Sequence, residues 1–246
     1  MCRFAHPWFW CAPAKISFCP GPMQGFIPGS ITPAEMDTTQ PMHIALAGNI
    51  GSGKTTLAEL LARELGWNVQ YEDPEDNPYI VDFYSDMNRW AFHMQVYFLN
   101  SRLNQTHKLQ QSGQPTVQDR TLYEDAEIFT PNLLSMGLMT QREYDTYDAL
   151  YKTVIQSVRP PDLVIYLRAS ISTLVDQIAA RNRQYEDSIR IDYLKRLNER
   201  YEAWFTNYSL GKKLEIVVDE VNFRDRPEDL GVVLSRVNAE LFGLFH

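Results

Sequence analysis

Short apolar runs alternate with longer amphipathic segments from Met42 onward. The run HIALAG at 43–48 ends in glycine and is typical of a buried parallel strand. Four further β-rich runs follow it: WNVQYED (67–73), PTVQDR (115–120), DLVIYLRAS (162–170) and LEIVVDE (214–220). The alternation predicts an α/β domain with a five-stranded parallel sheet and helices on both faces.

The segments between these runs have helical spacing. TLAELLARELG (56–66) predicts a helix that stops at Gly66, and RWAFHMQVYFLNSRL (89–103) is apolar nearly all round, which predicts a buried helix. PEDLGVVLSRVNAELF (227–242) predicts a last amphipathic helix. The segment 191–208 predicts a helix whose apolar face comprises Ile191, Leu194, Leu197, Tyr201, Trp204, Phe205 and Tyr208.

Residues 1–41 differ from the rest, since they hold seven of the 14 prolines and show no helical or strand period. We expect a disordered extension or upstream sequence that is not normally translated, with Met36 and Met42 as alternative starts, and one domain at 42–246. All three cysteines, Cys2, Cys11 and Cys19, lie in this segment. Their spacing does not suit a metal site, and a domain without other cysteines is typical of the cytoplasm.

Charge and hydropathy exclude two classes of protein. The net charge is −8, which argues against a general nucleic-acid binder. No apolar run reaches the roughly 18 residues that a membrane-spanning helix needs. A neutral small molecule remains compatible with this charge.

The stretch GNIGSGKTT, residues 48–56, fits the phosphate-binding pattern G-x-x-x-x-G-K-[ST] between a predicted strand and a predicted helix. Glycines let the backbone wrap phosphates, and a helix N-terminus offers unpaired N–H groups. Lys54 would reach the β- and γ-phosphates, and Thr55 would hold Mg²⁺. The predicted cofactor-binding residues here are Gly48, Asn49, Ile50, Gly51, Ser52, Gly53, Lys54, Thr55 and Thr56.

A small kinase fits this loop best. The chain has no N/T-K-x-D motif for guanine, and it is too short for the apparatus of an ATPase motor. The second strand run leads into YEDPEDNPY, where Glu72, Asp73, Glu75 and Asp76 lie within five residues. One carboxylate could accept a proton from an attacking hydroxyl, although most such runs are solvated loops. This acidic loop would repel a nucleoside monophosphate more than a neutral nucleoside.

Three further groups of residues carry candidate chemistry. Asp119 and Arg120 follow the third strand run, where they could serve a metal and a phosphoryl group or form only a salt bridge. Gln95 and Arg102 are two turns apart in the buried helix, which suits either a network serving the fold or a slot for a nucleobase. Arg181 and Arg183 follow a helix and could close over phosphates, or form a solvated helix end.

From Met42 to about Phe242 the sequence resembles the deoxyribonucleoside kinases, most of all the bacterial members that act on deoxyadenosine. NPYIVDFYSDMNRWAFHMQVYFLNSR (77–102) is the most specific segment of the resemblance. It implies a P-loop kinase fold, an ATP-dependent phosphotransferase of nucleotide salvage, ATP with Mg²⁺, and a cytoplasmic homodimer.

Carried over by position, the resemblance implies a role for each candidate. Glu72 would activate the substrate 5′-hydroxyl, with Asp73 as the alternative because Glu-Asp-Pro replaces the usual Glu-Pro or Glu-Leu-Val. Asp119 would lie near the metal and Arg120 near the reacting oxygen. The base readers would be Gln95, Arg102 and Asp125, with Phe129 packed nearby.

The remaining implied contacts lie at the two ends of the site. Tyr84 and Asp192 would hold the 3′-hydroxyl. Arg181 and Arg183 would form a lid, and the loop from Asp219 to Phe223 would hold the ATP adenine. Thr121 stands where serine is frequent in the family.

The implied reaction is in-line transfer of the ATP γ-phosphate to the 5′-hydroxyl of deoxyadenosine, with deoxyguanosine or deoxycytidine as alternatives. Asp125 with Gln95 favours a base that has an exocyclic amine beside a ring acceptor, and disfavours thymine. A thymidylate-type nucleoside monophosphate kinase and a catalytically silent kinase-like subunit are the competing interpretations.

Overall fold

The computed structural model describes residues 41–72, 74–183 and 189–243. The expected extension at 1–41 therefore lies almost wholly outside the described residues, as does Asp73. The strands are β1 (His43–Gly48), β2 (Asn68–Gln70), β3 (Thr116–Asp119), β4 (Leu163–Arg168) and β5 (Lys212–Val217). The longer helices are α1 (Lys54–Leu65), α2 (Ile80–Ser85), α3 (Met87–Ser112), α5 (Thr130–Ser135), α6 (Gln141–Val154), α7 (Ile171–Arg181), α8 (Ile191–Asn207) and α9 (Pro227–Phe242).

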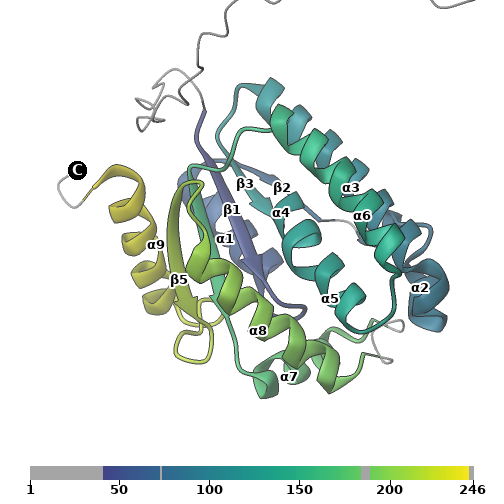
Figure 1. The fold of residues 1–246 in the computed structure, drawn as a ribbon. Coiled ribbons are helices and arrows are strands. Elements are labelled where there is room, and N and C mark those ends of the chain that lie inside the picture. The colour runs from purple at the N-terminus through teal and green to yellow at the C-terminus, as the bar shows by residue number, and fades with distance from the viewer. Residues whose placement is uncertain (1–40, 73, 184–188, 244–246) are drawn as a thin grey trace, which may run out of the picture. The chain divides into compact units, whose positions relative to one another are not determined.

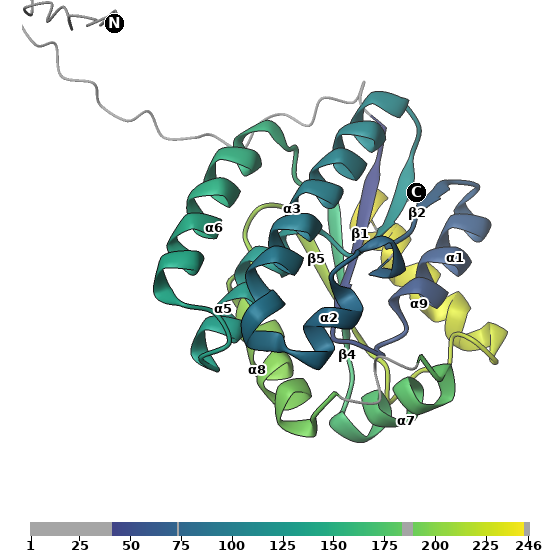
Figure 2. The same ribbon diagram turned by 90° about the vertical axis from the view of Figure 1, so that its right-hand side faces the viewer.

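The five strands form one parallel sheet in the order β2-β3-β1-β4-β5 (Figure 1). Helices cover both faces, with α1 and α9 on one side and α3 and α6 on the other (Figure 2). This confirms the predicted fold class. Because all strands run the same way, the loops at their carboxyl ends gather at one edge of the sheet.

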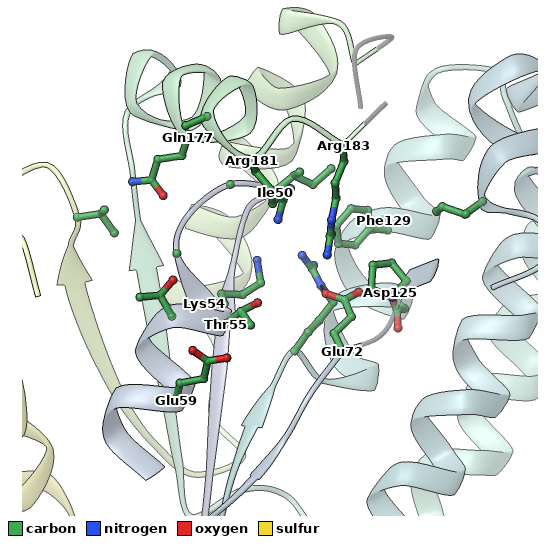
Figure 3. Close-up of a pocket in the computed structure, with 18 of the residues that line it drawn as sticks. Ile50, Lys54, Thr55, Glu59, Glu72, Asp125, Phe129, Gln177, Arg181 and Arg183 are labelled. Carbon is green, nitrogen blue, oxygen red and sulfur yellow. Dashed lines mark hydrogen bonds and ion pairs between the residues drawn. The ribbon is translucent and has the colours of Figure 1, made fainter. Parts of the chain in front are cut away.

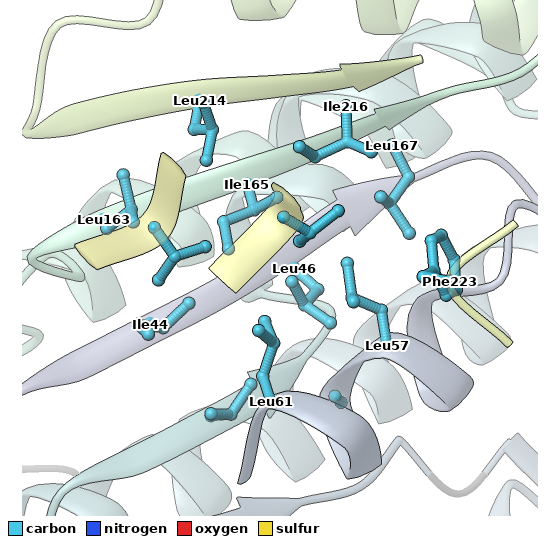
Figure 4. Close-up of a cluster of buried hydrophobic side chains, with 14 of the residues drawn as sticks. Ile44, Leu46, Leu57, Leu61, Leu163, Ile165, Leu167, Leu214, Ile216 and Phe223 are labelled. Atoms are coloured by element: carbon cyan, nitrogen blue, oxygen red, sulfur yellow. The ribbon is translucent and has the colours of Figure 1, made fainter. Parts of the chain in front are cut away.

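Alternation along the strands gives each face its own core. Ile44 and Leu46 of β1 pack toward α1 and α9 with leucines and isoleucines of β4 and β5 (Figure 4). Ala45 and Ala47 point to the opposite face, where aromatic side chains of α2 and α8 lie. Alanines at these two positions allow the helices of that face to approach the central strand closely. The apolar run of β1 is therefore continuous because both of its faces are buried.

Short elements connect β2 to α2 and β3 to α5. These are a 3₁₀ turn η1 (Pro74–Asp76), helix α4 (Leu122–Glu124) and a wide π-helical turn η2 (Asp125–Phe129), and a further 3₁₀ turn, η3 (Ile155–Ser157), follows α6. π-Helical turns occur mostly as single turns within α-helices and are frequently found at functional sites. In the described part of the chain, no helix is both long and apolar enough to span a membrane.

Two helix predictions were wrong in detail. Helix α3 is buried along one face only, and Phe92 and Val96 are partly buried against the cluster of Leu99, Ala126 and Tyr147. In α8, Ile191 is 53% exposed, since it begins the helix beyond the layer that the sheet covers. Tyr193 takes part in the buried face instead.

His43 at the start of β1 makes the stability of the fold depend on pH. Its side chain is buried, and Nε2 lies 2.9 Å from Oε1 of Gln118. Burial lowers the pKa of His43 to about 4, although the hydrogen bond that its side chain donates to Gln118 opposes this shift. The unfolded chain, with a pKa near the ordinary 6.5, binds this proton more readily between pH 4 and 6.5.

We therefore expect the free energy of unfolding to fall by about 2 kcal/mol between pH 7 and pH 5 through His43 alone. Urea unfolding of the parent and of His43→Leu at both pH values measures this. The pH-dependent loss should be smaller in the variant by that amount, whatever its stability at pH 7. Equal losses in both proteins would show that His43 does not titrate in this range.

Candidate active site

The phosphate loop leaves β1 at Gly48 and enters α1 at Lys54. Gly51 and Gly53 adopt φ angles of 81° and 89°, which favour glycine. A Cβ atom on Gly51 would also lie 2.8 Å from Cγ1 of Ile178. Asn49 anchors the loop to α8, because its side-chain amide donates to the Leu194 carbonyl at 2.9 Å and to Asn198.

Lys54 crosses the inside of this loop. Its ammonium group donates to the carbonyl oxygens of Gly48 and Asn49, at 2.9 Å each. Burial and the nearby Arg120 lower the pKa of Lys54 to about 8, against the opposing effect of three carboxylates. A nucleotide phosphate would offer this ammonium a far stronger partner than two carbonyls.

A cavity of about 870 Å³ opens beside the loop (Figure 3). The predicted residues that line it are Ile50, Gly51, Gly53, Lys54, Thr55, Thr56, Glu72, Tyr84, Gln95, Arg102, Arg120, Asp125, Phe129, Arg181, Arg183 and Phe223. Gly48, Asn49 and Ser52 are buried in the loop but do not line the cavity. The structure thus brings together residues that lie up to 173 positions apart in the sequence, from Ile50 to Phe223.

Thr55 lines the cavity and contacts Asp119, which is buried and does not line it. The threonine hydroxyl donates to Oδ2 of Asp119 at 2.5 Å. Among the described residues, the buried Oδ1 of Asp119 has no hydrogen-bond partner. A carboxylate oxygen and a hydroxyl beside a phosphate loop suit Mg²⁺, which prefers oxygen ligands, so the residues present fit this metal.

Glu72 lies between two arginines at the centre of the site. Its Oε1 accepts from Nη2 of Arg102 at 2.6 Å, and its Oε2 accepts from Nε of Arg120 at 2.8 Å. Burial alone would raise the pKa of Glu72, but Arg120 and Arg102 outweigh it and hold this pKa well below the usual range. The Glu72 carboxylate is therefore ionised at neutral pH.

The proposed base readers lie one layer deeper. Arg102 forms an ion pair with Asp125 through Nε and Oδ2, and both side chains are buried. Burial raises the pKa of Asp125 to about 6 even though Arg102 and Arg120 act in the opposite direction. Gln95 is also buried, and its Oε1 accepts from the hydroxyl of Thr130 at 3.2 Å.

Aromatic and basic side chains line the remaining sides of the cavity. The guanidinium of Arg120 lies over the ring of Phe129, 4.8 Å from its centroid. Arg181 and Arg183 extend from the end of α7 toward the cavity (Figure 3). Nε of Arg183 lies 3.5 Å from Oε1 of Glu75, so this arginine reaches across to the acidic loop after β2.

Comparison with known proteins identifies the group to which this arrangement belongs. Residues 44–242 match the family model described as deoxynucleoside kinase. The chain belongs to the deoxynucleoside kinase family. It is accordingly an ATP-dependent phosphotransferase, and the resemblance inferred from the sequence is confirmed.

Individual relatives of this deoxynucleoside kinase cover most of its length. A deoxyadenosine/deoxycytidine kinase of Bacillus subtilis is 30% identical over 79% of the chain and 90% of its own. A deoxyadenosine kinase of Dictyostelium discoideum is 37% identical over 74% of the chain and 73% of its own. A solved deoxyadenosine kinase from M. mycoides with bound dCTP matches with a TM-score of 0.71 and 30% identity, over 80% of the chain and all of its own.

Besides Gly48, Asn49, Ser52 and Asp119, two more predicted site residues of the kinase, Asp192 and Asp219, lie outside the cavity lining. The Asp192 side chain is 71% exposed and lies 3.8 Å from Arg190. Tyr84 lines the cavity, whereas Asp192 does not. Asp219 instead accepts hydrogen bonds from the backbone and hydroxyl of Ser170 and from the Thr173 hydroxyl, which ties the loop after β5 to the start of α7. Phe223, at the other end of that loop, does line the cavity.

The structure also adds residues that the sequence patterns did not single out. Glu124 and Tyr201 are fully buried beside Arg120, and Gln177 of α7 lines the cavity next to the phosphate loop. The spacing of Thr121 and Glu124 carries the Ser/Thr-x-x-Glu signature of a helix start, which could have located Glu124. Tyr201 appeared only as an apolar position of α8.

Proposed function

We propose that this kinase transfers the γ-phosphate of ATP to the 5′-hydroxyl of deoxyadenosine in preference to other deoxynucleosides. The observation that carries the proposal is the buried group of Gln95, Arg102 and Asp125 directly behind Glu72. A glutamine amide can donate to a ring nitrogen and accept from the adjacent amine of adenine. Asp125 adds a second acceptor, which a thymine carbonyl would not satisfy.

Relatives support the class of substrate. Those matched include proteins named as kinases of deoxyadenosine, deoxycytidine and deoxyguanosine. All three bases carry an exocyclic amine, and thymine does not. Deoxyguanosine and deoxycytidine therefore remain secondary substrates in the proposal.

The reaction is an in-line displacement. Glu72 accepts the proton of the 5′-hydroxyl as that oxygen attacks the γ-phosphorus. Arg120, held beside Glu72, donates to the phosphoryl oxygens, while Lys54 stabilises the charge on the leaving phosphate. Arg181 and Arg183 close over the phosphates, which excludes water from the transfer.

Thr55 and Asp119 would hold Mg²⁺, which when bound neutralises charge on the β- and γ-phosphates. Tyr84 lies on the wall of the cavity where it could contact the sugar, and Phe129 packs against Arg120 at the base end. The ATP adenine would lie against Phe223.

The strongly lowered pKa of Glu72 indicates the stage of the reaction at which the proton of the 5′-hydroxyl is transferred. A carboxylate held by two arginines is a weak base, so it takes the proton late, once the bond from the hydroxyl oxygen to phosphorus is forming. Late proton transfer agrees with the loose transition state that most analyses give to phosphoryl transfer.

We also propose that the kinase is a cytoplasmic homodimer that pairs through α3 and α6. Phe92 and Val96 of α3 are only partly buried, and Leu150 of α6 is 43% exposed. Apolar positions on two adjacent helices support such an interface. Sedimentation velocity on the full chain measures the assembly, and a monomer at micromolar concentration would contradict it.

Gln95→Leu tests the assignment of the base site. We expect kcat/KM for deoxyadenosine to fall by roughly 10- to 100-fold, because two hydrogen bonds to the base are lost. The four deoxynucleosides should then differ less from one another. Gln111→Leu, the same change at an exposed position of α3, is the matched control. An unchanged preference for deoxyadenosine in Gln95→Leu would contradict the assignment.

A further inference from the structure

Glu124 is a fully buried carboxylate that the reaction described above does not use. It is the third residue of the short helix that begins after Thr121. Its Oε2 accepts from the backbone N–H of Thr121 at 2.8 Å and from the Thr121 hydroxyl at 3.4 Å. The bond from the Thr121 N–H is one half of a capping box, and the Glu124 N–H directed at the Thr121 side chain is the other half. A capping box is a common way to start a helix.

The other carboxylate oxygen of Glu124, Oε1, accepts hydrogen bonds from three groups that do not belong to the helix cap. Oε1 accepts from the Tyr201 hydroxyl at 2.8 Å, from Nη1 of Arg120 at 3.4 Å, and from the backbone N–H of Gly48 at 3.3 Å. Gly48 is the first residue of the phosphate loop, and Tyr201 belongs to α8. One carboxylate therefore joins the phosphate loop, the segment after β3 and α8.

The second capping box of the chain shows what capping alone requires. At the start of α6, Glu143 accepts from the backbone and hydroxyl of Thr140 in the same way, at 2.8 Å each. That glutamate lies at the protein surface. Burial of a charged carboxylate is costly, so capping does not explain why Glu124 is buried completely.

Arg120 needs to be held in place. It has a φ angle of 66°, which is uncommon for a residue with a side chain and costs energy. Its Nε donates to Glu72, and its Nη1 donates to the Tyr201 hydroxyl at 2.7 Å as well as to Glu124. Among the described residues, Nη2 makes no hydrogen bond, so two nitrogens fix the plane of the guanidinium and the third is left for the phosphoryl group.

Tyr201 is itself rigid. Its ring stacks on that of Tyr166 in β4, with 5.9 Å between centroids and 7° between planes. The hydroxyl that meets Arg120 and Glu124 is therefore carried on a side chain packed against the central part of the sheet.

We propose that Glu124, acting together with Tyr201, is a positioning residue that aligns Arg120 with the phosphate loop for the transfer step. The proposal rests on the kinase function set out above. It assigns Glu124 no contact with substrate. Its loss leaves the binding groups in place and lets the Arg120 guanidinium turn away from the position in which it stabilises the transferring phosphoryl group.

The test compares Glu124→Gln and Tyr201→Phe with Glu143→Gln, which removes the same charge from the other capping box. We expect kcat to fall about 30-fold in the first two variants, with KM for ATP and for deoxyadenosine within about threefold of the parent. The double variant should lose much less than the product of the two single losses, because both changes release the same arginine. Glu143→Gln should keep the kcat of the parent.

A merely structural role would give a different result. It predicts a lower melting temperature in Glu124→Gln with a kcat within twofold of the parent, and that result would overturn the proposal. Tyr201→Phe changes no buried charge and nearly preserves volume, so it carries the test if Glu124→Gln does not fold.

A spectroscopic measurement separates this proposal from the assignment of substrate. The Nε–H NMR signal of Arg120, identified by its absence in Arg120→Lys, should shift in Glu124→Gln and Tyr201→Phe and not in Glu143→Gln. An unmoved signal in the first two variants would refute the positioning role. If the parent phosphorylates no deoxynucleoside but the signal shifts as expected, the proposed function fails and the positioning of Arg120 stands.

Discussion

Replacing Glu72 by glutamine is expected to lower kcat by about 10³-fold, within the range that general bases contribute. The amide keeps the size of the side chain and one acceptor oxygen, but it cannot accept the proton of the 5′-hydroxyl. KM for ATP should change little, because the hydrogen bonds of the Glu72 carboxylate go to Arg102 and Arg120 and not to the phosphate loop. Steady-state ADP release with saturating deoxyadenosine measures the effect.

The structure also predicts a cost in stability for this variant. Glu72 is held by Arg102 and Arg120, so a neutral side chain weakens two charge-assisted hydrogen bonds. Arg102 keeps Asp125 and Arg120 keeps Glu124, which should limit the loss to about 1–2 kcal/mol. The control is Asp76→Asn, an exposed carboxylate of the same acidic loop, which should retain full activity. A near-normal kcat in folded Glu72→Gln would show that Glu72 is not the group that accepts the proton of the 5′-hydroxyl.

Replacing Lys54 by methionine should have a comparable effect of about 10³-fold or more on kcat/KM for ATP. Methionine preserves the length of the side chain and removes the charge that meets the β- and γ-phosphates. Because burial lowers the pKa of Lys54 to about 8, its charge is not a source of stability in the nucleotide-free protein. The variant should therefore unfold within about 1 kcal/mol of the parent, or be more stable.

Lys54 also predicts a pH effect in the parent. As the pH rises through about 8, the free enzyme loses the proton of Lys54, and KM for ATP should increase. Lys152→Met, at an exposed position of α6, is the control for the substitution. ATP affinity in Lys54→Met equal to that of the parent, or a KM for ATP that stays flat from pH 7 to 9, would contradict the assigned role.

The strands and the phosphate loop were predictable because their signals are local. An apolar run that ends in glycine, followed by the pattern of 48–55, specifies a strand, a tight loop and a helix start within a few residues. Parallel order then brings the ends of β2 and β3 to the same edge, so the neighbourhood of Glu72 and Arg120 follows from topology.

The way in which the charged side chains pair could not be predicted from spacing. Glu72 contacts Arg102 and Arg120, which lie 30 and 48 positions away, and each arginine has a further acid partner. An arginine can pair with any of several nearby carboxylates, and small differences in helix position and rotamer decide which pair forms.

Asp192 and Asp219 show the limit of carrying residues over by position. Asp192 is the second residue of α8, and its side chain is exposed to solvent beside Arg190. Asp219 fulfils a local need instead, because it caps α7 through Ser170 and Thr173.

For Glu124 the sequence holds a local signal that accounts for only part of what the residue does in the structure. Its spacing from Thr121 indicates a helix cap, and that interpretation is correct but incomplete. The contacts of Oε1 with Gly48 and Tyr201 span 76 and 77 positions and leave no pattern in the sequence.

The measurement that tests the central claim most directly is ADP release from Mg-ATP by the full chain. The acceptors are deoxyadenosine, deoxyguanosine, deoxycytidine and thymidine, each beside its monophosphate. The account predicts turnover with the free deoxynucleosides, with the highest kcat/KM for deoxyadenosine and the lowest for thymidine. Turnover with monophosphates alone, or no turnover with any acceptor while ATP still binds, would contradict it.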